Sequence, residues 1–153
     1  RTPFTLALTQ RARQRGALTI GLAGNAGSPL LEVSEYPILI ETGSEVLAGS
    51  TRMKAGTAQK VALNLISTGL MIRLGRVYKG LMVDMQTSNI KLKARAARIV
   101  GQIAACEVAR AEEALEASGG NIKLGVLLAL DKPLEEAVKM LAASGGNLRK
   151  ALE

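Results

Sequence analysis

Histidine is absent from this sequence, and cysteine occurs once, at Cys106. Without histidine the chain cannot hold a Ser-His-Asp triad, a Cys-His pair or a histidine-ligated metal. A single cysteine excludes an internal disulfide and a thiolate zinc cluster, so the sequence predicts no metal site. We therefore expect Cys106 to be a small, buried apolar residue.

Aromatic residues are also scarce, at 2% of a 153-residue chain that is 48% hydrophobic, which predicts an aliphatic core. The longest apolar run, residues 61–72, is interrupted by Asn64, Ser67 and Thr68. It is shorter than the ~20 residues that a membrane span needs. No signal peptide opens the chain, so we expect a soluble, cytoplasmic protein with no membrane partner.

The formal net charge is +7, and a basic balance of this kind can indicate nucleic-acid binding. The positive residues are nevertheless spread along the chain. Arg11, Arg13 and Arg15 alternate and do not share one helical face, whereas Lys91, Arg95 and Arg98 do. Few aromatic rings are present to stack on bases. We predict no nucleic-acid partner and a solvated basic face or an acidic partner surface instead.

The first third of the chain has the pattern of an α/β protein. A helix is expected from Thr2, as N-cap before Pro3, to Gly16. Residues 17–22 and 36–40 are predicted to be buried strands, with a short helix over residues 30–34 between them. This order predicts a parallel sheet with helices on its faces. Because two strands do not make a stable sheet of this type, the chain is predicted to fold poorly by itself.

The run GSEVLAGSTRMKAGTAQK at residues 43–60 gathers glycines, hydroxyls, cations and one carboxylate at the start of a helix predicted over residues 50–74. Hydroxyls and backbone N–H groups at a helix start, backed by Arg and Lys, suit an anionic phosphate group. The preceding strand would place this ligand at the carboxyl end of a sheet. Residues 61–72 are apolar nearly all round, which predicts a buried helix.

Residues 77–86 are an extended arm or an edge strand, and from residue 87 the pattern is helical. Asn89 or Ser88 begins a helix to about Gln102, and another covers residues 107–117. The stretches LEASGGNI at 115–122 and LAASGGNL at 141–148 form a weak repeat, in which Gly ends one helix and Asn caps the next. We divide the chain into residues 1–86 and a small helical module, residues 87–153, similar to three-helix ubiquitin-associated units.

The run at residues 43–60 resembles the signature of the N-acetylmuramic acid 6-phosphate etherases, which share a sugar isomerase (SIS) domain with glucokinase regulatory proteins. Further agreement lies in Arg1-Thr2-Pro3, in residues 63–72, in residues 81–84 with Asn89, and in Gly145-Gly146. The resemblance covers essentially the whole chain, with Ser44 standing where the family usually has proline. It implies part of an αβα sandwich with a parallel sheet, a cytoplasmic homodimer, and no cofactor.

The activity that the resemblance implies is a carbon-oxygen lyase of amino-sugar recycling. It would cleave the D-lactyl ether of N-acetylmuramic acid 6-phosphate, by elimination and hydration, to N-acetylglucosamine 6-phosphate and D-lactate. Such chemistry needs positioned carboxyl groups. Glu45 is the candidate for proton transfer, and its alternative role is a first-turn glutamate that suits the helix dipole. Asn25, Ser50, Thr51, Arg52 and Lys54 are the candidate substrate-binding residues, with Ser28 beside Asn25.

The family's principal catalytic glutamates and its first phosphate loop belong to an N-terminal half that is not in this sequence, so we expect this chain alone to be inactive. An alternative stays open, namely a regulatory SIS protein that binds a sugar phosphate without catalysis. That alternative includes a SIS domain joined to a DNA-binding helix-turn-helix. The helical tail favours the etherase, because it follows that family's pattern to the end.

Overall fold

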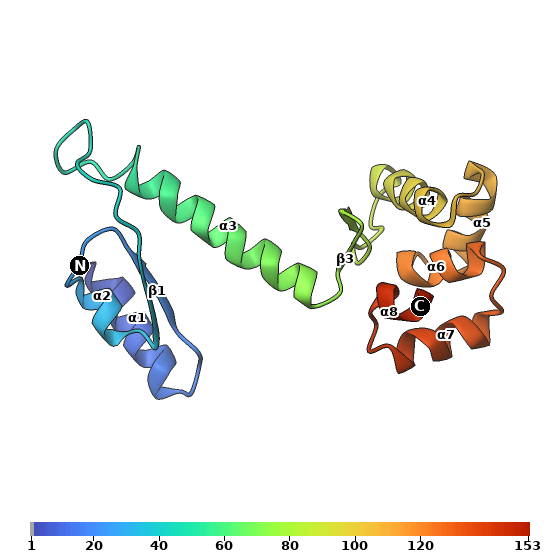
Figure 1. The fold of residues 1–153 in the computed structure, drawn as a ribbon, viewed down its shortest axis with the longest axis horizontal. Helices are drawn as coiled ribbons and strands as arrows, with labels where there is room; N and C mark the ends of the chain where they lie inside the picture. Colours follow the sequence, from blue (N-terminus) through green and yellow to red (C-terminus); the bar gives the residue numbers. More distant parts are fainter. Residues whose placement is uncertain (1) are drawn as a thin grey trace. The chain divides into compact units, whose positions relative to one another are not determined.

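The computed structural model describes residues 2–153, so Arg1 of the Arg-Thr-Pro motif lies outside the described residues. The chain divides into two compact units, Arg1–Ser67 and Thr68–Glu153, and the division falls inside one long helix, α3 (Figure 1). The predicted division at residue 87, and the likeness to a ubiquitin-associated module, stay predictions.

The first unit has the predicted α/β order. Its elements are α1 (Pro3–Gln14), β1 (Ile20–Ala23), α2 (Pro29–Val33), β2 (Tyr36–Leu39) and the greater part of α3 (Ala55–Arg73). β1 and β2 pair in parallel, with Ile20 opposite Tyr36 and Ala23 opposite Leu39. α2 packs against both strands and α1 packs against α2. The predicted fold class, an α/β fragment followed by a helical part, is confirmed.

A close approach between α2 and β1 explains the glycine inside the first strand. A Cβ on Gly21 would lie 2.9 Å from the carbonyl oxygen of Leu30 and would collide with Oγ of Ser34. The Ser34 hydroxyl itself donates a hydrogen bond to the Leu30 carbonyl, at 2.7 Å. Because any side chain at position 21 would push the helix outward, this glycine fixes the short crossover between the parallel strands.

The predicted burial of the strands and of α3 is wrong for the described residues. Ile20 is 42% exposed, Tyr36 is 52% exposed, and Leu65 on α3 is 69% exposed. No residue of α3 is buried. The physical reason is that burial of a parallel strand or an all-apolar helix requires a layer on each side, and within the first unit α2 packs against the sheet and α1 packs against α2.

α3 also begins five residues later than predicted, at Ala55 instead of Ser50. Residues 51–54 form turns. The carboxylate of Glu45 accepts hydrogen bonds from the backbone N–H groups of Lys54 and Ala55, at 3.0–3.3 Å. A side chain nine residues upstream thus caps the helix, and that contact has no local sequence signal.

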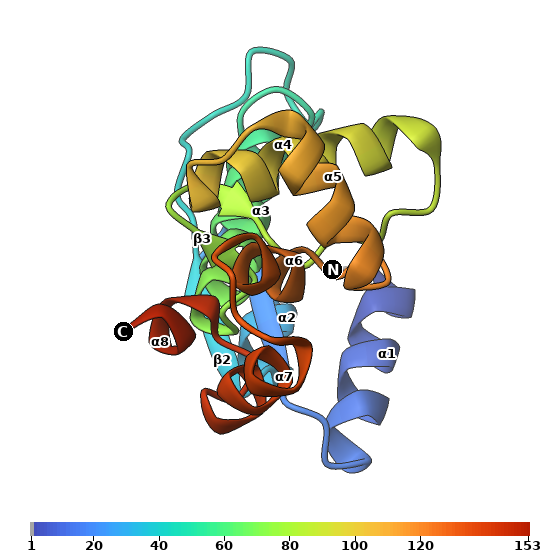
Figure 2. The same ribbon diagram turned by 90° about the vertical axis from the view of Figure 1, so that its right-hand side faces the viewer.

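The second unit is a β-hairpin followed by helices. Val77–Tyr78 (β3) and Leu81–Met82 (β4) pair antiparallel, so residues 77–86 contain a hairpin instead of a single edge strand. The helices are α4 (Ile90–Ala104), α5 (Val108–Ala117), α6 (Ile122–Ala129), α7 (Leu134–Ala143) and α8 (Leu148–Leu152). α6 packs against α4, α5 and α7 and is the central helix of this unit (Figure 2).

The core of the second unit is aliphatic, as predicted. Its buried residues are Val83, Ala96, Ala97, Ile99, Val100, Ala111, Ala114, Leu115, Ile122, Val126, Leu127, Ala129, Ala137 and Leu148. Cys106 is only partly buried, because it follows the end of α4, so the prediction of full burial is wrong. It packs against the core as a small apolar residue.

The weak repeat is a pair of equivalent helix junctions, and this prediction is confirmed. Ser118 and Ser144 each donate a hydroxyl hydrogen bond to the carbonyl three residues earlier, at 2.8 and 2.9 Å. The glycine pairs that follow have positive φ, 64° and 84° in the first junction and 62° and 73° in the second. Asn121 and Asn147 then accept hydrogen bonds from the first turns of α6 and α8.

Candidate functional site

A hollow of about 570 Å³ opens in the first unit where β1 and β2 end. Its walls come from the residues that follow each strand, from the glycine-rich loop and from the first turns of α3. The lining residues are Thr2, Leu22, Ala23, Gly24, Asn25, Ser28, Leu30, Thr42, Gly43, Ser44, Glu45, Ala48, Gly49, Thr51, Ala55 and Gln59. A cavity at the carboxyl ends of parallel strands is the expected place for a ligand in an α/β protein.

Three of the predicted site residues meet in this hollow. Asn25 follows β1, Glu45 lies in the loop after β2, and Thr51 precedes α3. Ser28 also lines the hollow and is buried, with only 9% of its surface exposed. These residues lie together because β1 and β2 pair in parallel, which brings the loops that follow the two strands to the same edge of the sheet.

Two side chains hold the glycine-rich loop closed against the start of α3. Glu45 accepts from the N–H of Lys54 at 3.1 Å and from the N–H of Ala55 at 3.0 Å. In the other direction, Nζ of Lys54 donates to the carbonyl oxygen of Ser44 at 2.8 Å. The loop is therefore fixed at two points. A carboxylate at a helix start is also favoured by the helix dipole.

Ser50, Arg52 and Lys54 do not line the hollow. Arg52 and Lys54 are exposed, and the Lys54 ammonium group is engaged with the loop backbone. Glu45 is consequently the one charged residue among those that line the hollow in the described part of the chain. The substrate-binding roles of Ser50, Arg52 and Lys54 remain predictions.

The structure adds three polar residues that the sequence did not single out. Thr2, Thr42 and Gln59 line the hollow. Sequence features could have identified two of them, because Thr2 belongs to the Arg-Thr-Pro motif and Thr42 follows the second predicted strand. Gln59 stands one helical turn after Ala55, on the same side of α3, and becomes recognisable only once the true start of that helix is known.

The chemistry available in the hollow is that of neutral donors and acceptors together with one carboxylate. Hydroxyl and amide side chains hydrogen-bond sugar hydroxyls and amides readily. Among residues 2–153, no group of His, Cys, Asp and Glu is arranged to hold a metal ion. Within the same range, no helix is both long enough and apolar enough to cross a membrane.

A polar hollow at the ends of parallel strands, closed by a glycine-rich loop that leads into a helix, defines the class of α/β proteins with a ligand site at the sheet edge. No protein-family model matches the chain. Curated relatives do match it, over essentially its whole length.

Several of these relatives bear the name N-acetylmuramic acid 6-phosphate etherase. The protein of that name from Deinococcus radiodurans is 45% identical over 152 residues, which cover 99% of this chain and 50% of the relative. The one from Rubrobacter xylanophilus is 49% identical over 153 residues, again 50% of its length. The one from Escherichia coli O1:K1 is 46% identical over 154 residues, or 52% of its length.

The resemblance read from residues 43–60 is thus confirmed, and the chain is homologous to the N-acetylmuramic acid 6-phosphate etherases. It spans about half the length of the curated relatives it matches.

Proposed function

We propose that the protein to which this chain belongs is an etherase that cleaves the D-lactyl ether of N-acetylmuramic acid 6-phosphate. The observation that carries the proposal is the meeting of Asn25, Glu45 and Thr51 in one hollow, in a chain 45–49% identical to proteins of that name. The products would be N-acetylglucosamine 6-phosphate and D-lactate, which makes the protein a carbon-oxygen lyase.

The reaction is an elimination followed by a hydration. A base removes the proton on the carbon next to the open-chain aldehyde, and an acid protonates the ether oxygen as lactate leaves. Water then adds across the double bond, which restores the hydroxyl of the sugar. Both proton transfers need carboxyl groups held in position, and no redox cofactor is required for either step.

Within the hollow, we assign Asn25 and Thr51 to direct contact with the sugar. Their amide and hydroxyl groups line its wall and suit hydroxyl and N-acetyl groups. Arg52 flanks the same loop and is assigned to the phosphate as a positive group, with the Ser50 hydroxyl as a further donor and with Lys54, which also holds the loop backbone, nearby. Because these residues do not line the hollow, this assignment places the phosphate group of the substrate at the rim of the hollow.

We propose two roles for Glu45, namely positioning of the loop and proton transfer, and a substitution can separate them. Both carboxylate oxygens accept backbone N–H groups at the start of α3, which makes the side chain a positioning group for the loop. The same carboxylate lines the hollow and is the candidate for proton transfer. Glu45→Gln keeps one acceptor oxygen but removes the proton-transfer group.

The same proposal covers the domain organisation, the oligomeric state and the cellular location of the protein. Residues 1–86 would form the C-terminal portion of a SIS domain and residues 87–153 a helical module. The complete protein would work as a cytoplasmic homodimer. By this proposal residues 1–153 by themselves are inactive, because the remaining acid and base groups lie in the half that this chain does not cover.

The decisive experiment is lactate release from N-acetylmuramic acid 6-phosphate by the full-length protein. Thr51→Val and Asn25→Ala should each lower kcat/KM by about tenfold or more, because each removes a hydrogen bond to the substrate. Thr57→Val is the matched control, since Thr57 lies on α3 and does not line the hollow. It should leave kcat/KM within about twofold.

Glu45→Gln separates the two roles of this residue. A role in proton transfer predicts a loss of about 10²-fold or more in kcat with KM little changed. A purely positioning role predicts a smaller loss, shared with lower thermal stability. If the protein binds the sugar phosphate and releases no lactate, the etherase is excluded and the regulatory SIS protein takes its place.

A further inference from the structure

A hollow with both polar and apolar lining lies on the helical unit, between the β3–β4 hairpin and α4. Its volume is about 480 Å³, and it is lined by Gly80, Leu81, Met82, Arg95, Arg98, Ile99 and Gln102. All of these residues belong to Thr68–Glu153, so the hollow is complete within one unit. Its volume falls within the range of about 300–1,000 Å³ that is usual for small-molecule sites.

One stripe of α4 supplies the polar wall. Arg95, Arg98 and Gln102 follow each other at intervals of three and four residues, so their side chains leave the same side of the helix. Two guanidinium groups and one amide thereby face a common space. A guanidinium group presents a planar fork of donors that matches the oxygens of a phosphate or carboxylate.

Among the described residues, no ion pair neutralises the positive charge of this stripe. Residues 73–102 contain seven Lys and Arg residues but a single acidic residue, Asp84. Asp84 is already engaged, with Nε of Arg76 at 3.3 Å and with Nζ of Lys123 at 3.2 Å. In the described chain neither Arg95 nor Arg98 makes an ion pair, so both guanidinium groups are open to a ligand.

The rest of the lining is largely apolar and comes from both α4 and the hairpin. Ile99 is buried in the core, and Leu81 is partly buried and packs against that core. Met82 extends this wall at the hairpin and is 51% exposed. A site that combines charged donors with aliphatic carbon suits a small organic molecule that carries one anionic group.

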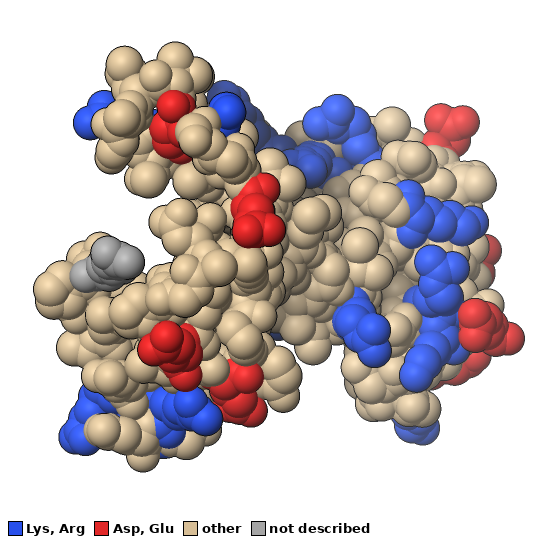
Figure 3. Space-filling model, turned by 60° about the vertical axis from the view of Figure 1, so that its left-hand side comes forward, with Lys and Arg blue, Asp and Glu red and all other residues tan. Residues whose placement is uncertain are grey.

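We propose that this hollow binds a small phosphomonoester, whose phosphate oxygens accept hydrogen bonds from Arg95 and Arg98. The carbon skeleton of the ligand would lie against Leu81 and Met82. A nucleic acid fits less well, because no aromatic ring lines the hollow. On the face drawn in Figure 3, Lys and Arg side chains lie among Asp and Glu side chains and uncharged surface.

The test is a titration of the full-length, 15N-labelled protein with glucose 6-phosphate at constant ionic strength, with glucose as the uncharged probe. We expect saturable shifts at the Gly80 amide and the Gln102 side-chain amide with glucose 6-phosphate and none with glucose. Arg95→Gln combined with Arg98→Gln should weaken binding by about tenfold or more. Arg95→Lys with Arg98→Lys keeps the charge but loses the forks, and should give an intermediate loss.

The matched control removes two positive charges elsewhere on the same unit, by Lys139→Gln with Lys150→Gln. Neither lysine lines the hollow, so we expect binding within about twofold of the starting protein. Equal weakening in both double variants, or shifts that never saturate, would overturn the site and leave only general charge attraction. Tighter binding of a DNA duplex than of glucose 6-phosphate through the same arginines would also overturn it.

The readout follows residues of the helical unit only. It is therefore independent of the proposed etherase activity and of the hollow at β1 and β2. Loss of lactate release in the Thr51 variant, with the Gly80 shift retained, would separate the two sites. Because Arg95 and Arg98 are exposed, we expect their substitution to leave the fold of the unit unchanged, as the remaining amide resonances would verify.

Discussion

The two units of the chain differ in how far their apolar side chains are buried. In the described residues, every buried hydrophobic side chain belongs to Thr68–Glu153, from Val83 to Ala151. In Arg1–Ser67, Leu18 is 63% exposed, Leu63 is 55% exposed and Leu65 is 69% exposed. Exposed apolar side chains in such number are typical of a surface that another layer covers. The difference teaches that the helical unit carries its own core, whereas the large apolar side chains of the α/β unit find no core within that unit.

The largest expected effect comes from separating the units. Residues 68–153 produced alone should unfold cooperatively on heating and retain slowly exchanging amides, because their core is complete. Residues 1–67 produced alone should show no cooperative transition, since two strands with an open edge and one covering helix layer are marginal in water. Circular dichroism and hydrogen exchange would measure both. A cooperative transition in residues 1–67 would break the comparison.

The next effect is a cavity in the core of the helical unit. Leu127 has no exposed surface, so Leu127→Ala should lower the free energy of unfolding of residues 68–153 by about 2–5 kcal/mol. Leu134→Ala is the matched control in the same unit, because Leu134 is 50% exposed. Its effect should stay within about 0.5 kcal/mol. Denaturant unfolding at equilibrium would measure both values.

The same truncation on α3 sharpens the comparison between the units. In the full-length protein we expect Leu65→Ala to cost about 2 kcal/mol or more, because a covering layer would bury this side chain. In residues 1–153 alone the same change should have no measurable effect on the helical unit. If Leu65→Ala were neutral in the full-length protein too, the uncovered face of α3 would not be a packing surface.

Local patterns in the sequence predicted much of this molecule. Asn89, Asn121 and Asn147 were recognised as caps because capping is decided within one helical turn. The parallel order of the first unit followed from short apolar runs joined by a short helix. These features depend on neighbours in the sequence.

The features that the sequence did not predict depend on distant contacts. The cap of α3 by Glu45 spans nine residues along a loop, so the helix start was placed too early at Ser50. Burial of the strands and of α3 was expected from their composition, but burial is a property of the layers that surround an element. For the same reason the lining role of Gln59 could be read only from the structure.

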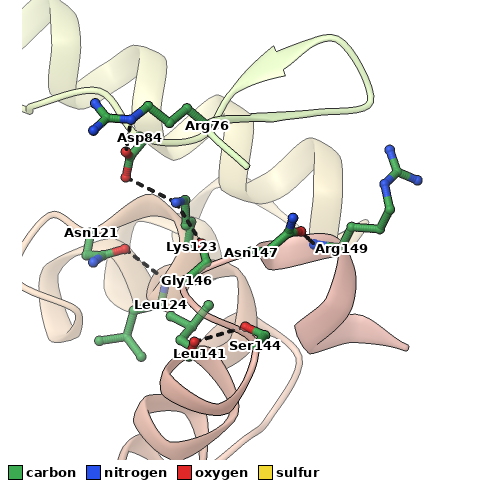
Figure 4. A network of polar contacts seen from close by, with 10 residues as sticks. All are labelled: Arg76, Asp84, Asn121, Lys123, Leu124, Leu141, Ser144, Gly146, Asn147 and Arg149. Carbon is green, nitrogen blue, oxygen red and sulfur yellow. Dashed lines mark hydrogen bonds and ion pairs between the residues drawn. The ribbon is translucent and has the colours of Figure 1, made fainter. Parts of the chain in front are cut away.

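A polar network that ties the hairpin to the helices gives the next smaller effect (Figure 4). Nζ of Lys123 lies 3.2 Å from Oδ1 of Asp84 and donates to the carbonyl oxygen of Gly146 at 2.8 Å. Lys123→Met should lower the stability of the helical unit by about 1–3 kcal/mol, because it leaves that carbonyl without its donor. Lys132→Met, which breaks the more exposed pair with Glu136, is the control and should cost at most about 0.5 kcal/mol.

Amide hydrogen exchange would show whether the loss of this network loosens one part of the helical unit or lowers the stability of the whole unit. Asp84 also lies 3.3 Å from Nε of Arg76, a contact that Lys123→Met does not remove, so we expect the hairpin itself to remain paired. We expect faster hydrogen exchange in the second SGGN junction, near Gly146, and little change within the hairpin. Equal acceleration across the whole unit would mean that the network contributes only to global stability.

The smallest effect tests whether the two halves of the repeat are energetically equivalent. Oδ1 of Asn121 accepts from the N–H of Leu124 at 3.1 Å, and Oδ1 of Asn147 accepts from the N–H groups of Arg149 and Lys150 at 3.1 and 3.4 Å. Asn121→Ala and Asn147→Ala should each lower the free energy of unfolding by about 1 kcal/mol, since each removes a helix cap. Glu107→Ala is the control, because the Glu107 side chain makes no cap hydrogen bond at the start of α5. A cost at Asn121 well above that at Asn147 would show that the central helix α6 depends on its cap more than the terminal helix α8 does.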